Sequence, residues 1–209
     1  KLGGLIDMAN SAEATKVITG KVRLSYVRLF EPQVTENGDE RLERYSCSIL
    51  IPKEDKETLR KIKAAIDAAI QDGINSKWGG KLPPNLKKPL RDGDTERPDD
   101  PAYAGHYFIN ASSLTKPGIA KPIGRGPDGK MRFQEITDST EVYSGCYARV
   151  SLNFYAYNKN GNKGIGAGIN NVVKVQDGEY LGGRARLEDD FADVDFDDVM
   201  DFGDDDFLN

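Results

Sequence analysis

The sequence of 209 residues is long enough for one domain of good size or two small ones. Its formal net charge of −5 argues at first against a nucleic-acid binder, and no apolar run approaches the roughly 18 residues of a membrane span. One histidine and two cysteines leave few members for a histidine-rich metal site, a Cys–His nucleophile or a disulfide framework. We therefore expect no membrane span and no cofactor, and we expect Cys47 and Cys146 to be buried free thiols.

The charge is divided unevenly along the chain. Residues 188–209 contain 11 acidic residues and no Lys or Arg, whereas residues 1–187 hold all 29 basic residues and the other 23 acidic ones, a net charge of +6. Such asymmetry indicates interaction with polyanions or with basic partners. Residues 1–7 read like a vector-derived remnant ahead of Met8. We expect a disordered N-terminus over 1–13, one folded domain over 14–187 and a disordered acidic tail over 188–209.

Two strands are predicted first. Apolar and polar side chains alternate over 15–30, which is typical of a half-buried strand. A turn signal over 36–40 leads to a second alternating run over 44–51, which Pro52 ends. The expected inward side chains are Ile18, Val22, Leu24 and Tyr26 in the first strand and Tyr45, Cys47, Ile49 and Ile51 in the second.

One amphipathic helix follows over 54–71. Leu59 and three isoleucines recur at helical spacing, acidic residues enrich the first turn, and Gly73 marks the expected end. Residues 75–104 then contain five prolines and six basic side chains, which predicts a long irregular loop. We expect the helix to cover one side of a sheet.

The sequence after residue 105 is typical of β-strands. A strand over 107–113 precedes a hairpin with arms over 119–125 and 130–136, and an Asn-Gly loop joins a long strand over 144–157 to a last one over 163–175. In the last strand we expect Val173 and Val175 to share the face of the isoleucines. On its other face Gly164, Gly166 and Gly168 alternate. They either allow another backbone or a nucleic-acid base to approach the strand closely, or they allow the barrel to bend. Six to eight strands without βαβ alternation predict a mainly β fold, an antiparallel barrel resembling the oligonucleotide-binding (OB) fold with one helix and a long insertion.

The strand over 144–157 carries the clearest functional signal. One of its faces is a plain apolar core, and the other reads Tyr147, Arg149, Ser151, Asn153, Tyr155 and Tyr157. Aromatic faces stack on bases and cations bind phosphates, which is what a single-strand binder needs, although cross-strand tyrosine packing is the alternative. If the polar face of the first strand is continuous with this one, Lys21 and Arg23 complete a basic, aromatic-lined groove.

Weaker candidates lie elsewhere. Arg125 and Arg132, with Lys130, flank the hairpin turn and could bind backbone phosphates. Trp78 lies in the irregular loop, and Tyr103 and Phe108 lie where that loop returns to the sheet. We predict DNA contacts for these residues too, with ordinary packing or surface decoration as the alternative.

The acidic tail combines charge with spaced apolar side chains. Its acids could occupy the aromatic-lined groove predicted beside the strand over 144–157 when DNA is absent. Its apolar residues could bind a partner protein. A tethered segment has a high effective concentration, so it competes even when its intrinsic affinity is weak. The alternative is a solvated solubility aid. The residues that we expect to bind partners are Asp204, Asp205, Asp206, Phe207 and Leu208.

Several segments together resemble the phage and prophage single-stranded DNA-binding proteins long filed as a domain of unknown function. The resemblance spans roughly residues 14–190 and implies an OB fold, sequence-independent binding of single-stranded DNA and a role in phage replication or recombination in the cytoplasm of the bacterial host. It also implies phage or host replication and recombination proteins as partners of the tail. The tail departs from the commonest pattern because Leu208 and Asn209 follow Phe207. The resembling segments are 20–26, 51–53, 149–158, 164–172 and 181–184.

We therefore predict a protein that coats single-stranded DNA and is not an enzyme. The sequence has no GxxxxGK[ST] phosphate-binding loop, and most of its concentrated acid lies in the tail, which is poor scaffolding for a metal site. A metal-dependent nuclease or strand-processing enzyme is one alternative. A protein-interaction adaptor with an acidic tail and no affinity for nucleic acid is the other.

Overall fold

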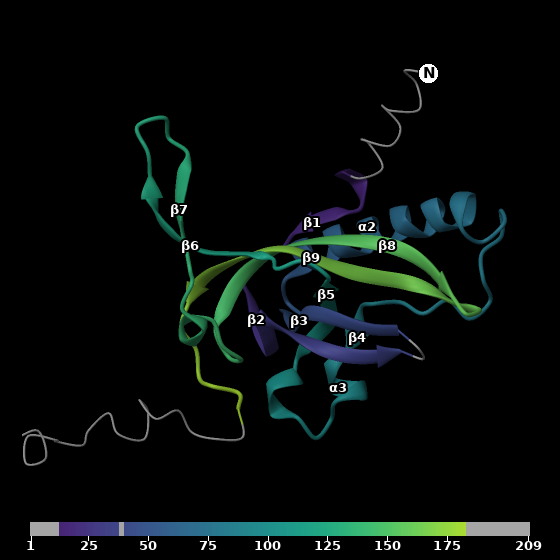
Figure 1. The fold of residues 1–209 in the computed structure, drawn as a ribbon, viewed down its shortest axis with the longest axis horizontal. Helices are drawn as coiled ribbons and strands as arrows, with labels where there is room; N and C mark the ends of the chain where they lie inside the picture. Colours follow the sequence, from purple (N-terminus) through teal and green to yellow (C-terminus); the bar gives the residue numbers. More distant parts are fainter. Residues whose placement is uncertain (1–12, 38–39, 183–209) are drawn as a thin grey trace, which may run out of the picture.

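The structure, a computed structural model, describes residues 13–182 with the exception of 38–39 (Figure 1). Residues 1–12 and the acidic tail over 188–209, both predicted to be disordered, lie outside the described residues. The strands are β1 Lys16–Ile18, β2 Val22–Asn37, β3 Glu40–Pro52, β4 Arg91–Asp92, β5 His106–Ser113, β6 Gly118–Arg125, β7 Met131–Glu135, β8 Tyr147–Lys159 and β9 Asn162–Gln176. All nine belong to one sheet.

Five of these strands close into a barrel. β2 pairs with β3, β3 with β5, β5 with β9, β9 with β8, and β8 again with β2. The β5–β9 pair is parallel and the other four are antiparallel. A closed five-stranded barrel of this kind is an OB fold, which confirms the predicted fold class. The β6–β7 hairpin projects from this barrel (Figure 1).

The helix α2 (Lys56–Ser76) packs against the interior side of the barrel, where it contacts β8 and β1. Asp55 caps its first turn by accepting a hydrogen bond from the backbone N–H of Thr58. The predicted stop at Gly73 is wrong, because the helix continues through this residue. A Cβ there would lie 2.7 Å from the Cβ of Ala156 and from the ring of Trp78, so the glycine serves close packing instead. In the described part of the chain, no helix is long and apolar enough to cross a membrane.

A bulge in β2 changes which side chains point inward. The register with β3 shifts between Ser25 and Arg28, and within this bulge Tyr26 has a φ of 48°. Bulges turn side chains to a new direction, and the ring of Tyr26 is 56% exposed. Upstream, β1 directs Val17 inward and leaves Ile18 60% exposed. The prediction that Ile18 and Tyr26 belong to the core is therefore wrong.

A second irregularity lies in β9. Leu152 pairs with Ile169 but Ser151 pairs with Asn171, so Asn170 is an extra residue in the ladder. From that point the side-chain alternation is inverted. Val172 is buried and Val175 is exposed, which corrects the expectation that Val173 and Val175 share the inner face.

The segment over 77–105 is an irregular insertion folded over the surface of the barrel. Lys87 forms a bridge with Gly164 of β9, and the later part of the segment lies on the outside of β3 and β5. Its strand β4 pairs with β5, and it contains the short helix α3 (Gly93–Glu96) and a 3-10 helix over Pro101–Tyr103. Leu50, Tyr103 and Phe108 form a small second core under it, with the two rings edge to face at 5.0 Å between centroids. This insertion therefore has its own buried apolar contacts.

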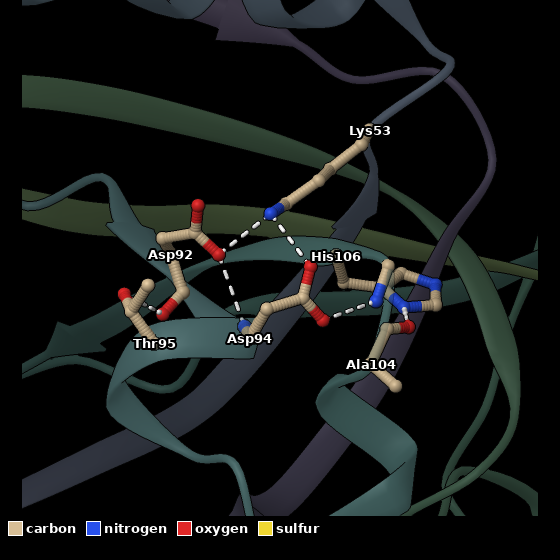
Figure 2. Close-up of polar contacts among 7 residues, drawn as sticks. Lys53, Asp92, Asp94, Thr95, Ala104 and His106 are labelled. Atoms are coloured by element: carbon tan, nitrogen blue, oxygen red, sulfur yellow. Dashed lines mark hydrogen bonds and ion pairs between the residues drawn. The ribbon is translucent and has the colours of Figure 1, made fainter.

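A polar cluster holds the insertion against the end of β3 (Figure 2). Lys53 Nζ lies 2.7 Å from one carboxylate oxygen of Asp92 and 2.7 Å from one of Asp94. The other oxygen of Asp94 accepts a hydrogen bond of 2.8 Å from the backbone N–H of Gly105, and His106 Nδ1 donates to the carbonyl of Ala104. The hydrogen bonds to the two carboxylates raise the pKa of Lys53, and those from Lys53 and Gly105 lower the pKa of Asp94.

Candidate nucleic-acid interface

Strand β8 presents the predicted row of polar and aromatic side chains on the outside of the barrel. Its even-numbered residues from Cys146 to Ala156 are buried, as the alternation predicts. On the outer side Arg149 and Tyr155 are exposed, and Tyr147, Asn153 and Tyr157 are half-buried. Ser151, in the middle of this row, is buried. We call Tyr147, Arg149, Asn153, Tyr155 and Tyr157 the tyrosine face.

The glycines of β9 lie under the tyrosine face. Tyr155 is the cross-strand partner of Gly166, and Tyr157 is the partner of Gly164. A Cβ on Gly166 would lie 2.6 Å from Tyr155 Cζ, and one on Gly164 would lie 2.5 Å from the Tyr157 hydroxyl oxygen. The tyrosine side chains therefore occupy the space above the glycine strip. The ring of Tyr155 nevertheless remains 41% exposed, so cross-strand packing and an accessible aromatic surface coexist here.

Two cations at the start of β2 adjoin this face, as the sequence predicts: Arg23 lies in β2 and Lys21 directly precedes it. Arg23 pairs with Tyr147 across the two strands. The Tyr147 ring centroid is 5.7 Å from the Arg23 guanidinium carbon and 5.3 Å from Lys21 Nζ. Arg23 also donates hydrogen bonds to the carbonyl oxygens of Gly145 and Glu179, which fix its position without neutralising its charge.

A second surface, which sequence reasoning missed, lies on the outer side of β2, β3 and β5. It consists of two hollows of about 770 Å³ and 370 Å³ that share Tyr26 in their linings. Arg23 lines the larger hollow and so connects it to the tyrosine face. We call the two hollows together the basic groove. Their linings include three arginines, two acids, Tyr26 and polar residues of β3 and β5, namely Arg23, Arg28, Arg97, Asp100, Glu179, Tyr26, Ser46, Ser48, Asn110 and Ser112.

The alternation of polar and apolar residues in β3 and β5 could have predicted this groove from the sequence. Ser46 and Ser48 alternate with buried apolar residues in β3, and Asn110 and Ser112 do so in β5. The strand-and-loop face around the second and third strands of an OB barrel is a common site for oligonucleotides. By contrast, the outward direction of Tyr26 depends on the β2 bulge, which no local pattern predicts.

Three predicted aromatic contacts are packing residues. Trp78, Tyr103 and Phe108 are 6%, 1% and 0% exposed, and their rings leave no accessible face for a base. Trp78 Nε1 donates to the carbonyl of Tyr157 at 3.1 Å, and the Tyr103 hydroxyl donates to Ser48 Oγ at 3.0 Å. The prediction that these three residues contact DNA is corrected accordingly.

The structure places Arg125 and Arg132 on the projecting β6–β7 hairpin. Arg125 donates to the carbonyl of Gly129 at 2.7 Å, and Arg132 forms an ion pair with Asp128 at 3.1 Å. Both contacts lie within the hairpin and stabilise its turn. These cations stand apart from the Lys21–Arg23 pair, so any DNA contact that they make is a separate one.

The two cysteines and the placement of His, Asp and Glu side chains bear on thiol and metal chemistry. Cys47 and Cys146 are free and buried, as expected, and burial raises the pKa of Cys47 to about 12. A thiol with so high a pKa is protonated at neutral pH and is a weak nucleophile. Over 13–182, without 38–39, no three His, Cys, Asp or Glu side chains are placed to hold a metal ion.

Comparisons with known proteins identify the family to which the sequence is similar. A family model described as the single-stranded DNA-binding protein of Enterobacter phage Enc34 matches residues 15–202. The chain is 31% identical over 194 residues to protein p50 of Acyrthosiphon pisum secondary endosymbiont phage 1, covering 86% of this chain and 94% of that protein.

Solved structures give the same result for the fold. The bacteriophage Enc34 single-stranded DNA-binding protein in complex with single-stranded DNA superposes with a TM-score of 0.66 and 26% identity, over 81% of this chain and 91% of that one. The single-stranded DNA-binding protein gp2.5 of bacteriophage T7 superposes with a TM-score of 0.52 at 14% identity, over 86% of this chain and 93% of that one. The second likeness concerns the fold alone.

Proposed function

This chain belongs to the Enterobacter phage Enc34 single-stranded DNA-binding protein family, and from that membership we propose that it binds single-stranded DNA without regard to sequence and without catalysing a reaction. The observation that carries the proposal is the exposed tyrosine face of β8 with Lys21 and Arg23 beside it. Phosphates bind to Lys21, Arg23 and Arg149. Bases stack on the tyrosines, with Asn153 as a hydrogen-bonding neighbour. Base–aromatic stacking contributes about 1–3 kcal/mol per base and accepts every base.

The basic groove extends this path around the barrel. Arg23 belongs to both surfaces, so a strand that crosses Tyr147 can continue toward Tyr26. Arg28 and Arg97 then supply positive charge, and Tyr26 supplies a second exposed ring. Arg125 and Arg132 on the hairpin remain proposed phosphate contacts at the periphery.

The acidic tail is proposed to compete with DNA and to recruit phage or host replication and recombination proteins in the cytoplasm of the bacterial host. The last described residues support competition, because residues 179–182 line the larger hollow of the basic groove. Arg23 binds the carbonyl of Glu179, and the backbone N–H of Leu181 donates to the carbonyl of Ser144. The chain therefore leaves the described body beside the groove, where a tethered polyanion has a high effective concentration.

DNA binding is tested by gel shift with a poly-dT oligonucleotide over a series of salt concentrations. We expect a shift whose log–log salt dependence steepens by about 0.7 per phosphate neutralised, with weaker binding to a duplex of the same length. A salt-insensitive affinity would contradict the electrostatic contacts. Absence of a shift would favour the adaptor, and cleavage of the labelled oligonucleotide in Mg²⁺ or Mn²⁺ would favour the nuclease.

Competition by the tail is tested by removing residues 188–209. We expect the shortened chain to bind poly-dT more tightly at low salt, and the difference should shrink as salt screens the acids. A matched variant that replaces the tail's aspartates with asparagines keeps the length and should behave like the deletion. Weaker binding in both variants would refute competition.

A further inference from the structure

A largely apolar hollow lies at the base of the β6–β7 hairpin, away from the basic groove. Its volume is about 590 Å³, and side chains from β1, β6, β7, β8 and β9 line it. Two large apolar side chains at this site are exposed to solvent, Ile18 to 60% and Phe133 to 54%. We call it the hairpin hollow. Exposed apolar groups around a concave surface are typical of a binding site for an apolar group.

The polar groups of the hairpin hollow indicate what kind of ligand would fit. Ser151 lines it and is 9% exposed, and its hydroxyl oxygen is the one buried side-chain polar atom among the described residues that has no hydrogen-bond partner. Lys16 and Arg149 also line it, and both are exposed. Glu135 is the one acid of the lining. A ligand with an apolar side chain, hydrogen-bonding groups and negative charge matches this set.

We propose that the hairpin hollow binds the end of this chain's own acidic tail, with Phe207 in the hollow and the aspartates before it beside Lys16 and Arg149. Segment 204–208 places three aspartates directly before two apolar residues. The basic hairpin next to the hollow carries Arg125, Lys130 and Arg132, which favours an acidic occupant over a second copy of the hairpin itself.

The chain is long enough for this contact. Phe207 lies 25 positions after Gly182 in the chain. A segment of that length can span up to about 80 Å, whereas a domain of this size has a radius of gyration of about 15 Å. The end of the tail can therefore reach the hairpin hollow from the groove where it begins.

The inference rests on the proposed function in one respect, the role of Arg149. This residue lines the hairpin hollow and belongs to the tyrosine face. A docked tail would cover a cation that DNA needs, so docking and DNA binding at this position exclude each other. The tail then competes through a defined site as well as through its net charge.

Disulfide trapping in the full-length chain tests the contact. One variant carries Ile18→Cys and Asn209→Cys, which leaves Phe207 in place. The matched control carries Leu82→Cys and Asn209→Cys, because Leu82 is similarly exposed, at 58%, but does not line the hollow. The natural cysteines are buried in both. Under mild oxidation we expect the first pair to crosslink about tenfold faster than the control pair. A docked tail raises the effective concentration of the residue-209 thiol beside the hollow.

Two further changes identify the docking residue. Adding Phe207→Ala to the first pair should remove the rate advantage, whereas Phe202→Ala should preserve it. Poly-dT should also suppress the crosslink. A crosslinked monomer supports docking of the chain's own tail, whereas a crosslinked dimer would show the tail of a second copy in the hollow and would overturn docking within one chain.

Equal crosslinking rates for the two pairs would overturn the inference. Gel shifts of the reduced variants with poly-dT separate this result from a failure of the proposed function. Binding to poly-dT without selective crosslinking removes only the hairpin hollow as a docking site. Absence of binding to poly-dT removes the proposed function, whatever the crosslinking shows.

Discussion

Aromatic side chains with cations nearby occur in two regions of this protein, the strand β8 and the insertion over 77–105. In β8, Tyr155 has 41% of its surface exposed above a strip of glycines. In and beside the insertion, Trp78, Tyr103 and Phe108 are 6% exposed or less. Similar composition thus leads to an accessible surface in one region and to interior packing in the other.

The difference comes from the backbone. A strand paired on both sides satisfies its N–H and C=O groups in the ladder, so its side chains must alternate outward whatever their type. The insertion has few such ladder bonds. It lies on the sheet through Tyr103, whose ring packs edge to face on Phe108 of β5, and through the ion pairs of Asp92 and Asp94 with Lys53. Aromatic residues in a segment that is not paired as a β-strand therefore indicate how the segment packs on the protein. They are weaker evidence for a ligand-binding site.

The largest expected effect is a loss of stability on substitution of Trp78, and it tests whether this ring serves packing or DNA binding. Trp78→Ala removes a ring that packs on Gly73 and a hydrogen bond to the carbonyl of Tyr157, and we expect it to lower the free energy of unfolding by about 3–5 kcal/mol. Trp78→Phe keeps much of the packing and should cost less. Chemical denaturation measures both. If Trp78→Ala left stability unchanged and abolished binding to poly-dT, the ring would belong to the DNA site after all.

A smaller effect is expected for the tyrosine face. Tyr155→Ala should weaken binding to all single-stranded sequences alike by about 1–3 kcal/mol, because one stacking surface is lost. Tyr155→Phe keeps the ring and should bind nearly as the natural protein does. Titration of fluorescent oligonucleotides measures both variants, and thermal unfolding checks that each remains folded. An unchanged affinity in Tyr155→Ala would remove this residue from the site.

The smallest effect concerns the ion pairs that close the insertion. Because its hydrogen bonds to Lys53 and Gly105 lower the pKa of Asp94, folding favours the ionised carboxylate. This contribution is fully present above the ordinary aspartate pKa of about 3.9 and is lost as the pH falls through the lower folded value. We expect Asp94→Asn to melt slightly below the natural protein at neutral pH.

The comparison of Asp94→Asn with the natural protein should be repeated from neutral to acidic pH. The difference between their melting temperatures should narrow as the carboxylate of Asp94 becomes protonated. It should be smaller than the effect of Trp78→Ala, because these ion pairs are partly exposed and solvent screens them. A larger loss in Asp94→Asn would mean that ion pairs, and not buried rings, hold the insertion in place.

Much of the site could be predicted because it depends on local periodicity. The alternation of β8 placed Tyr147, Arg149 and Tyr155 outward, and the alternation at the start of β2 placed Lys21 and Arg23 beside Tyr147. The Asn-Gly hairpin at Asn160 and Gly161, both with positive φ, joined β8 to β9 as expected. Whether these residues contact DNA remains a prediction.

The sequence by itself determined the main strands, the existence of the long helix, the outward tyrosines and the charge division between body and tail, because each depends on neighbours in the chain. Only the tertiary structure decided the direction of Tyr26, the inversion of β9 beyond Asn170 and the burial of Trp78, Tyr103 and Phe108. Bulges and inter-element packing arise from the register between segments far apart in sequence. A pattern read along one strand does not contain that register.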